Sequence, residues 1–392
     1  MSRIEQLITE LCPNGVEYKL FGEIAMIVRG ASPRPIKNFI TDDKNGVHWI
    51  KIGDVEQGAK YITSTNERIT EEGAKKSRFV HKGDFILSNS MSFGRPYILK
   101  IDGCIHDGWL SISNFEKYLI SDFLYYVLIS TPIQKEMKQK ASFGGAVQNL
   151  NADIVKSISI PVPPLEVQAE IVKILDNFTE LTAELTAELT TELTARKKQY
   201  EYYRDSLLSF NENDCEWRTL KEIAENCDSK RKPVTKGNRT SGDYPYYGAS
   251  GIVDYVDDYI FDGDYLLVSE DGANLLARVT PIAFSISGKN WVNNHAHVLR
   301  FNTYVTRRFV EIYLNSINLE KYISSAAQPK LTQDNLNKIP IPYPTIEKQT
   351  RIVSILDRFD KLCNDISEGL PAEIEARRKQ YEYYRDKLLS FN

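Results

Sequence analysis

The sequence predicts an α/β (α+β) fold in which two globular mixed α/β domains are separated by two long antiparallel repeat helices. Three observations lead to this prediction. A stretch of 56 residues occurs twice in the chain of 392 residues, and most of this stretch has helical periodicity. The two blocks outside the repeat alternate strand-like segments with short helical ones, as mixed α/β domains do.

The repeat sets the expected domain boundaries. Residues 156–211 align without gaps on residues 337–392, and 30 of the 56 aligned positions are identical. We therefore predict a first domain at 1–155, a repeat helix at 156–211, a second domain at 212–336 and a C-terminal repeat helix at 337–392. The N-terminal segment resembles the tail of a repeat that leads into a variable block. We therefore expect a pseudo-twofold, circular arrangement with neighbouring chain termini.

In the first repeat copy, the segment from Leu165 to Phe210 is expected to form one long helix. Its run LTAELTAELTTELTA consists mostly of helix-favouring residues. Leucine recurs every four residues in this run, at Leu181, Leu185, Leu189 and Leu193. In the second copy, Gly369 and Pro371 should interrupt the helix, with a restart at Pro371. We expect the two repeat helices to pair as an antiparallel spacer; packing of each against its own domain is the alternative.

The two variable blocks carry the expected strands and short helices. Strands are predicted at HWIKIGDV, GDFILSNS and PYILKIDGCI in the first block, and at GIVDYVDDYIF, GDYLLVSE and HAHVLRF in the second. Helices are predicted at SDFLYYVLISTPIQKEMKQKA and at TRRFVEIYLNSINLEKYI. Each block is thus expected to form a mixed α/β domain of modest size.

Composition and charge narrow the class of protein. Charged residues make up 26% and hydrophobic residues 42% of the chain, as in a folded globular protein. The longest apolar run, FLYYVLI, is too short to cross a bilayer, and we see no signal peptide. The five cysteines form no CxxC pair, so we expect reduced thiols in a cytoplasmic protein. The net charge of −4 argues weakly against a nucleic-acid binder, but the acid excess lies mainly in residues 151–211.

Motifs for catalysis are absent from the sequence. There is no GxxxxGK[ST] phosphate loop, no GxGxxG, no HExxH and no GxSxG, so we expect no catalytic residue in this chain. His295 and His297 are expected on one face of a strand, but two histidines do not make a metal site, and we expect no metal. Asp264, Glu270 and Asp271 leave open a self-contained nuclease, although acidic residues are common in turns.

Basic and amide-rich loops are the best candidates for a ligand surface. Loops rich in Gly, Pro, Ser and Asn place cations and backbone N–H groups close to phosphates, and Asn, Gln, Arg and Lys can read base edges. One such cluster is more often a solvated surface, but two in separate domains favour DNA reading. The candidate DNA-binding residues are Arg29, Arg34, Lys37, Lys75, Lys76, Arg78, Arg95, Gln148 and Asn149 in the first block, and Lys230, Arg231, Lys232, Lys236, Arg239, Lys289 and Asn290 in the second.

The end of the repeat is nearly invariant, because 15 of the 17 positions in 195–211 match those in 376–392. An apolar stripe at helical spacing is usually core or helix-pair contact, and duplicated surfaces suit two copies of one partner. We expect helix packing and partner binding, together with the four leucines, from Tyr200, Tyr203, Leu207, Phe210, Tyr381, Tyr384, Leu388 and Phe391.

The whole chain resembles the specificity subunit of a type I restriction-modification enzyme. The resemblance rests on the duplicated KKQYEYYRDSLLSF and RKQYEYYRDKLLSF, on PPLEVQAEIVKILDNFTELTAEL, and on the openings CPNGVEYKLFGEIA and CEWRTLKEIA. The second block also shows YPYYGASGI, GDYLLVSEDGAN and GKNWVNNHAHVL, which are typical of the target recognition domains of that family. The TAEL run resembles the central spacer of one subgroup, but only the first repeat copy keeps it.

The resemblance implies a non-catalytic, sequence-specific subunit that binds double-stranded DNA. Each variable domain would read one half of a split, asymmetric target. The repeat helices would dock two modification subunits, which bind S-adenosylmethionine and methylate adenine at N6. Two restriction subunits, which use ATP and Mg²⁺, would complete the enzyme, and no cofactor is expected in this chain. A self-contained nuclease and a coiled-coil scaffold without DNA reading are the alternatives.

Overall fold

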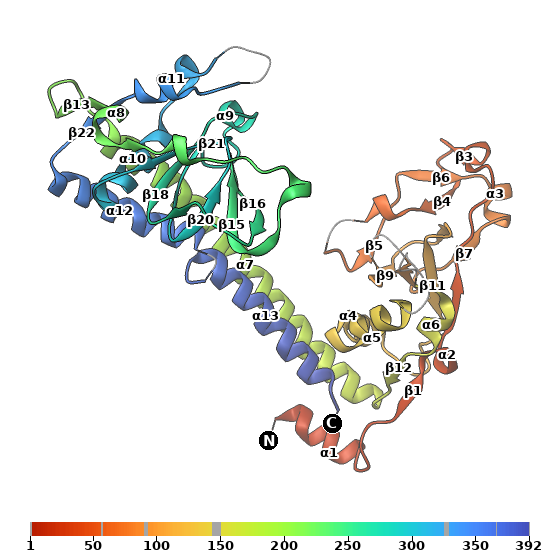
Figure 1. The fold of residues 1–392 in the computed structure, drawn as a ribbon. Coiled ribbons are helices and arrows are strands. Elements are labelled where there is room, and N and C mark those ends of the chain that lie inside the picture. The colour runs from red at the N-terminus through yellow and green to blue at the C-terminus, as the bar shows by residue number, and fades with distance from the viewer. Residues whose placement is uncertain are drawn as a thin grey trace. The chain divides into compact units, whose positions relative to one another are not determined.

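A computed structural model describes residues 2–55, 58–89, 93–142, 150–324, 329–365 and 367–391. The chain divides into two compact units (Figure 1). Unit 1 comprises Met1–Glu188 and Ile374–Asn392, and unit 2 comprises Leu189–Glu373. Each unit therefore contains one variable block and a part of both repeat copies. Within the described ranges, no helix is both long enough and apolar enough to span a membrane.

Unit 1 contains two five-stranded sheets. The order of the first is β2 (Met26–Arg29), β11 (Trp109–Ser113), β8 (Phe85–Ser88), β9 (Pro96–Leu99) and β5 (Tyr61–Ile62). The order of the second is β3 (Ile40–Thr41), β6 (Glu67–Ile69), β4 (Val47–Ile50), β10 (Gly103–Ile105) and β7 (Arg78–Val80). A two-stranded ladder joins β1 (Tyr18–Leu20) to β12 (Ser159–Pro161).

The first sheet of unit 1 is buried on both faces. Successive residues of a strand point to opposite faces, so Phe85 and Leu87 enter one apolar core while Ile86 enters another. The short helices of this unit are α1 (Arg3–Leu11), α2 (Phe21–Ile24), α3 (Glu71–Lys75), α4 (Ser121–Ile129), α5 (Thr131–Ser142) and α6 (Ala152–Lys156), with 3₁₀ turns η1 (Ile36–Asn38) and η2 (Ile52–Asp54). The single helix expected after residue 120 is thus two helices, because the chain is extended at Ser130.

Unit 2 repeats this architecture with a different sequence. Its sheets are β14 (Glu225–Asn226), β21 (Ala296–Arg300), β18 (Tyr265–Ser269) and β19 (Ala283–Ile286), and β16 (Gly251–Val256), β15 (Ser241–Gly248), β20 (Lys289–Val292) and β17 (Phe261–Asp262). The ladder partner of β13 (Glu216–Thr219) is β22 (Pro340–Tyr343). The remaining elements are α8 (Leu220–Ile223), α9 (Asn274–Ala277), α10 (Tyr304–Ser316) and α11 (Gln333–Asn337), with turns η3 (Asp228–Lys230), η4 (Lys236–Asn238) and η5 (Glu320–Tyr322).

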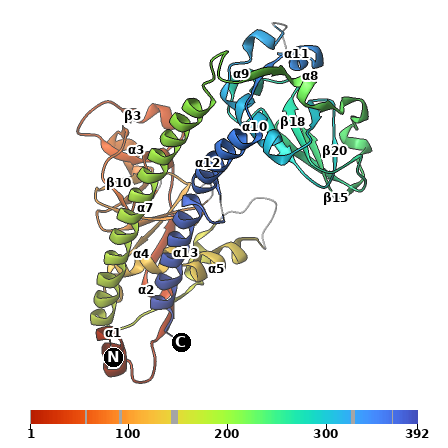
Figure 2. The same cartoon turned by 90° about the vertical axis from the view of Figure 1, so that its left-hand side faces the viewer.

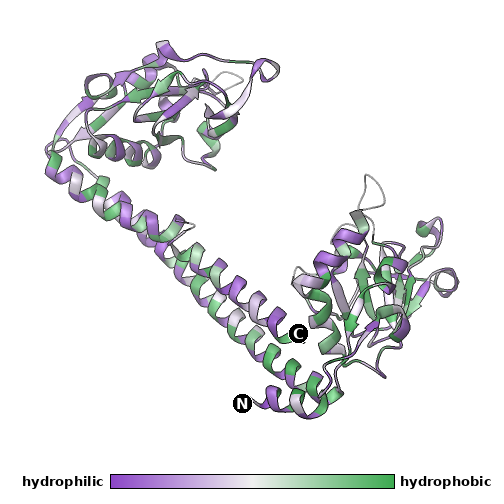
Figure 3. Ribbon diagram, turned by 60° about the horizontal axis from the view of Figure 1, so that its bottom comes forward, coloured by the Kyte–Doolittle hydropathy of each residue, from purple (hydrophilic) through white to green (hydrophobic). Residues whose placement is uncertain are grey.

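The two domains share their strand order, which confirms the predicted pair of mixed α/β domains. The order β2-β11-β8-β9 in unit 1 corresponds to β14-β21-β18-β19 in unit 2. The order β6-β4-β10-β7 likewise corresponds to β16-β15-β20-β17, and in both sheets the central pair is parallel. In each domain the inner strands carry mostly hydrophobic residues (Figure 3).

The repeat helices pair antiparallel inside each unit. The first copy is one helix, α7 (Leu165–Leu208), as predicted to within two residues. The second copy is α12 (Ile346–Asn364) followed by α13 (Leu370–Leu389). The first part of α7 lies beside the last part of α13 in unit 1 (Figures 1 and 2), where the rings of Phe178 and Tyr384 are 6.2 Å apart. In unit 2 the end of α7 meets α12, where Tyr203 stacks on Phe359 at 5.5 Å.

The interruption of the second repeat copy falls where Gly369 was expected to cause it. A Cβ on Gly369 would lie within 3 Å of the carbonyl oxygens of Asp365, Lys361 and Leu362, so the turn tolerates only glycine. Both repeat helices also pack on their own domains, so the alternative packing is realised in addition to the pairing. Ile4, Leu7 and Leu389 share one core cluster, which confirms neighbouring chain termini.

Candidate nucleic-acid interface

Each domain has a basic loop in the connection that leads from its first sheet to its second sheet. The strand orders of the two domains correspond. In unit 1, residues 30–39 lead from the edge strand β2 into the second sheet at β3. In unit 2, residues 227–240 lead from the equivalent edge strand β14 into the second sheet at β15. Unrelated sequences thus place cation-rich loops at equivalent positions.

In unit 1, strand pairing brings the arginines at the loop together. Arg29 pairs with Leu110 of β11, and Arg78 pairs with Ile105 of β10, the strand that precedes β11. Arg78 Nε therefore reaches the carbonyl oxygen of Arg29 at 3.3 Å, and Arg29 Nε donates to the carbonyl of Asp107 at 3.0 Å. The loop leaves β2 at Gly30, and the backbone of Gly30 packs directly against the carbonyl group of His106.

Asp107 holds the unit 1 loop and leaves one of its cations in solvent. The Ser32 hydroxyl donates to the Asp107 carboxylate at 2.7 Å. This hydrogen bond lowers the pKa of Asp107, and the charges of His106 and Arg29 add to the effect against the opposing influence of burial. Arg34 lies 3.8 Å from the same carboxylate but keeps 84% of its side chain exposed. The Arg34 guanidinium thus stays largely in solvent.

The lysines of the first domain gather beside this loop. Phe39 follows η1, and its carbonyl accepts from the Thr70 N–H at 2.8 Å just before α3. This contact lies at the start of α3, while Lys75 is the last residue of that helix and Lys76 is its C-cap; Lys37 belongs to η1, two residues before Phe39. The ammonium of Lys76 lies 4.7 Å from the centre of the Phe39 ring.

Arg95, another residue predicted to bind DNA in the first domain, lies away from this loop in the chain. Arg95 lies between β8 and β9, with its guanidinium 5.9 Å from the centre of the Tyr97 ring. The structure therefore does not bring Arg95 together with the loop cations of the same domain by any contact among the described residues. Gln148 and Asn149 lie outside the described residues.

In unit 2, the loop begins with a buried ion-pair network instead of a close backbone contact. Arg231 lies between the carboxylates of Asp228 and Glu270 and donates to the Ala296 carbonyl at 2.9 Å. Only 13% of its side chain is exposed. Arg231 thus anchors the loop, and few of its N–H groups remain for a phosphate.

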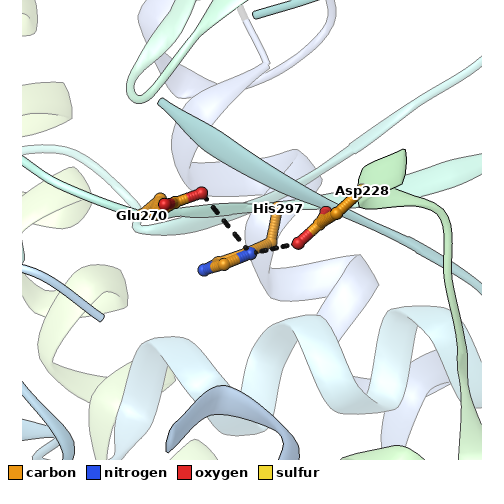
Figure 4. A group of neighbouring side chains, drawn as sticks. All are labelled: Asp228, Glu270 and His297. Carbon is orange, nitrogen blue, oxygen red and sulfur yellow. Dashed lines mark hydrogen bonds and ion pairs between the residues drawn. The ribbon is translucent and has the colours of Figure 1, made fainter. Parts of the chain in front are cut away.

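His297 completes this network from the central strand β21 (Figure 4). Its Nδ1 lies 2.6 Å from the Asp228 carboxylate, and its Nε2 lies 2.8 Å from the Leu331 carbonyl. Burial raises the pKa of Asp228, but the hydrogen bond and charge of His297 outweigh burial, and the pKa is lowered overall. For Glu270, burial is likewise outweighed by hydrogen bonds from Arg231 and Lys330, so its pKa is also lowered.

The same three side chains have the composition of a metal site but the contacts of an ion-pair network. The ligand atoms of Asp228, Glu270 and His297 lie within 4.8 Å of one another. Both ring nitrogens of His297 already lie at hydrogen-bond distance from an oxygen, of Asp228 on one side and of the Leu331 carbonyl on the other, so neither is left for a metal. Arg231 pairs with both carboxylates, and Lys330 pairs with Glu270 as well. The cluster therefore serves to hold β21, the basic loop and the chain near Leu331 together.

The residues of the nuclease alternative do not converge. Asp264 and Glu270 flank opposite ends of β18, which places them roughly 20 Å apart at about 3.3 Å per residue. Asp271 pairs with His295 at 2.9 Å. His295 lies just before the start of β21 and is half exposed, whereas His297 lies on β21 and is buried. The nuclease alternative has no support.

Two of the remaining predicted cations of the second domain line an open groove of about 500 Å³. Lys232 lies on its wall, with its ammonium 6.0 Å from the centre of the Trp291 ring. Arg239, also on the wall, pairs with Asp254 at 3.0 Å and packs over Tyr246. Exposed lysines at the loop and on β20 are Lys230, Lys236 and Lys289.

Two neighbouring residues of β20 differ from what the sequence suggested about which side chains face the surface. Asn290 is fully buried and donates to the Gly288 carbonyl at 2.8 Å, so its amide faces the interior and not a base. Trp291, its neighbour on β20, lines the groove instead and was not among the predicted residues. The alternation of the strand decides which of the two faces the groove, and the strand register was not readable from the sequence.

Two domains of one strand order, each with a cationic loop at the same connection, define a duplicated binding protein without a catalytic constellation in the described ranges. The chain belongs to the family of the type I restriction modification DNA specificity domain, whose model matches residues 13–195 and 212–376. This finding confirms the family named by the resemblance. The assignment to a TAEL subgroup stays a prediction.

Named relatives agree with this family. The EcoprrI specificity subunit of Escherichia coli is 31% identical over 337 residues, which cover 82% of each chain. The EcoR124I/EcoR124II specificity subunit of Escherichia coli is 39% identical over 60% of this chain and 63% of that one. A putative specificity subunit of Haemophilus influenzae is 39% identical over 184 residues, so this chain spans 47% of that relative.

Solved structures show the same fold. A chain from a study of complex assembly and conformational transition of the type I R-M system matches with a TM-score of 0.70 at 16% identity, covering 96% of this chain and 98% of that one. The HsdS subunit from Thermoanaerobacter tengcongensis matches with a TM-score of 0.55 at 18% identity, covering 96% of each.

Proposed function

We propose that this chain is the DNA-binding specificity subunit of a type I restriction-modification complex and reads a split, asymmetric target. The observation that carries the proposal is the placement of two cation-rich loops at one equivalent connection of two domains. Relatives at 31% and 39% identity are named as type I restriction enzyme specificity subunits, which supports it. The scaffold alternative leaves the duplicated cationic loops without a role.

The exposed cations supply the affinity, and the groove supplies the choice of sequence. Arg34, Lys75 and Lys76 in the first domain and Lys232 and Lys236 in the second are exposed and suited to phosphates. Phosphate contacts fix the position of a protein on the duplex, whereas contacts with base edges specify sequence. The groove beside Trp291 is lined by Asn238 and by acidic side chains, which can accept hydrogen bonds from base amino groups.

The partners follow from the same proposal. Two modification subunits bind S-adenosylmethionine and methylate adenine at N6, and two restriction subunits use ATP and Mg²⁺. This chain holds no cofactor and has no catalytic residue of its own. The repeat helices act as the spacer between the two readers. The complex works in the cytoplasm, together with the DNA that it reads.

A domain exchange tests the proposal. Residues 212–336 are replaced by the matching block of a relative, and methylated adenines are mapped in cells that carry the modification subunit. One half of the methylated sequence should change while the other half and the gap stay the same. A change in both halves would contradict independent reading. Salt-independent absence of binding to any duplex would favour the scaffold.

A further inference from the structure

A polar contact joins each recognition domain to the repeat helix of its own unit. Latch 1 in unit 1 consists of Lys60 and Tyr126 from the domain and of Asp176 and Thr179 from α7. Latch 2 in unit 2 consists of Tyr304 and Arg308 from α10 and of Asp357 and Asp360 from α12. In the repeat alignment, Asp176 corresponds to Asp357 and Thr179 corresponds to Asp360. The two latches therefore use the same positions of the repeat.

In latch 1 the domain meets α7 through a hydroxyl and an ammonium group. The Tyr126 hydroxyl donates to Asp176 at 2.6 Å. The Lys60 ammonium lies 2.6 Å from Asp122 of α4 and 3.8 Å from Asp176. The rings of Tyr125 and Tyr126 are each centred 5.1 Å from this ammonium. Burial by itself would lower the pKa of Lys60, but Asp122 outweighs burial and the pKa is raised. Lys60 therefore stays charged between the domain and the helix.

Latch 2 uses a guanidinium group in place of the ammonium group. Arg308 donates from Nε to Asp357 at 2.7 Å and from a second nitrogen to Asp360 at 2.7 Å. The Tyr304 hydroxyl donates to Asp357 at 3.2 Å. Arg308 also donates to Glu311 on its own helix, and only 17% of its side chain is exposed. Unrelated domain sequences thus bring a tyrosine and a cation to the same aspartate of the repeat.

The two repeat copies differ where the two domains differ. Asp176 is unchanged in the second copy, although its side chain is exposed and aspartate is a weak helix former. Three residues further along the repeat, Thr179 lies 3.2 Å from the Tyr126 hydroxyl, whereas Asp360 accepts from Arg308. The repeat thus offers a hydroxyl where the domain presents a hydroxyl, and a carboxylate where the domain presents a guanidinium. This match indicates that each contact works as a unit.

Apolar packing and the latches make different contributions to the position of a domain. Ile171 and Leu175 of α7 share one apolar core with Val127 of the first domain. The hydrophobic attraction in such a core has no preferred direction, so it holds a domain to a helix without fixing the angle between them. Hydrogen bonds between charged groups have a defined geometry. The latches therefore supply the directional part of the contact.

Unit 1 has a second directional contact that unit 2 lacks among the described residues. Gln168 accepts from the Ile120 N–H at 2.8 Å, just before α4. This contact lies about 12 Å before Asp176 along α7, at about 1.5 Å per residue. The counterpart of Gln168 is Gln349, whose Oε1 is buried and has no hydrogen-bond partner in the described part of the chain. The angle of the second domain therefore depends more strongly on its latch.

We propose that Asp176 and Asp357 are positioning residues that fix the angle of each recognition domain on its own repeat helix, and that they thereby set how strictly the chain selects the gap between its two half-sites. This proposal rests on the proposed function. One extra base pair in the gap moves a half-site by about 3.4 Å and turns it by about 35°. A domain that is fixed on its helix resists this change, whereas a domain that can turn follows it.

The gap preference of the complex tests the proposal. Methylated adenines are first mapped for the full-length chain with its modification subunit, which defines both half-sites and the gap. Initial methylation rates are then compared on three duplexes, with the native gap and with one base pair more or fewer. The latch 1 variant is Asp176→Ala, and the latch 2 variant is Asp357→Ala with Asp360→Ala. The matched controls are Glu180→Ala and Glu201→Ala, which also remove exposed carboxylates from α7.

These variants leave the helices and the domain cations intact. Alanine favours helix more than aspartate does. Lys60 keeps Asp122 as a partner, and Arg308 keeps Glu311. We expect the preference for the native gap to fall about tenfold in the latch 1 variant, as for the loss of one hydrogen bond to a charged group, and further in the latch 2 variant. The half-site sequences and the preference of both controls should stay as in the wild type.

The possible outcomes separate the latches from the proposed function. If the wild type methylates no split sequence, the proposed function itself is wrong. An unchanged gap preference in both latch variants would overturn the latches and leave the proposed function intact. Rates that fall by one common factor on all three duplexes would show a merely structural role, which also overturns the proposal. An equal loss of preference in the controls would assign the effect to helix charge instead.

A second pair of variants keeps the test decisive if the alanine variants misfold. Tyr126→Phe and Tyr304→Phe remove only the hydroxyl that donates to each aspartate. Both should lower the gap preference in the same direction but by less, because the cation of each latch remains. A gap preference equal to that of the wild type in both phenylalanine variants would overturn the proposal.

Discussion

The two recognition domains solve one structural task in two ways. Both carry a cation-rich loop at the connection between their sheets, and both must hold that loop against the central strand. Unit 1 uses close backbone packing at Gly30 and one hydrogen-bonded carboxylate, Asp107. Unit 2 uses a buried network centred on Arg231 and His297. The sheets fix where the loop lies, and the side chains that hold it are free to differ, so one frame can present two different surfaces to DNA.

The largest difference between the domains is expected on removal of their arginines. Arg231→Ala should destabilise unit 2 by about 3–5 kcal/mol, because it leaves the buried carboxylates of Asp228 and Glu270 without their cation. Arg34→Ala should change the stability of unit 1 by less than about 0.5 kcal/mol, since its side chain is exposed. Urea unfolding followed through Trp291 and Trp109 separates the two units. Equal effects of the two changes would contradict the network.

A matched pair of glycines tests the close packing of the unit 1 loop. A Cβ on Gly30 would lie 2.1 Å from the His106 carbonyl oxygen, so Gly30→Ala must displace the loop. We expect a loss of about 1–3 kcal/mol in the stability of unit 1. Gly237 in the unit 2 loop has open space around its Cβ position, so Gly237→Ala should be neutral or slightly stabilising. Thermal unfolding of both variants measures this, and a neutral Gly30→Ala would refute the close packing.

Exposed lysines should contribute equally in both domains. Lys75→Ala with Lys76→Ala, or Lys232→Ala with Lys236→Ala, should each reduce the slope of log affinity against log salt by about two, or about one per lost phosphate contact. Lys173, exposed on the repeat helix α7, is the control and should leave the slope unchanged. The slopes are measured by fluorescence anisotropy on one target duplex. An unchanged slope for either pair would place that pair away from DNA.

The smallest expected difference appears in acid. The pKa of Asp228 is lowered in the folded protein, so its stabilising contribution is present above the unfolded pKa of about 4 and is lost as the pH falls through the lower folded value. Glu270 acts in the same direction. Unit 2 should therefore lose stability below about pH 4 before unit 1, whose Asp107 is more exposed and more screened. Acid titration of single-tryptophan variants shows the order, and earlier loss of unit 1 would contradict it.

Local patterns in the sequence were enough to predict the repeat, the long helix and the break at Gly369. Helical periodicity, helix propensity and glycine conformation depend on residues close in the chain, so they can be read without a structure. The basic loops were visible for the same reason, because their composition is local. The strand segments were also found, although β4 ends at Ile50 and the expected strand continues as the turn η2.

Only the tertiary structure decided which members of these segments face outward. Arg231 and Lys232 are neighbours in one basic run, yet the first is held among Asp228, Glu270 and Ala296 while the second is exposed. The partners of Arg231 lie up to 65 residues away in the sequence. The exposed face of each repeat helix was likewise not readable from its own sequence, because it depends on the register of the helix that pairs with it. Segments distant in the chain determine which side chains are buried and which helices and strands pair. Composition and periodicity do not show which of these segments come into contact.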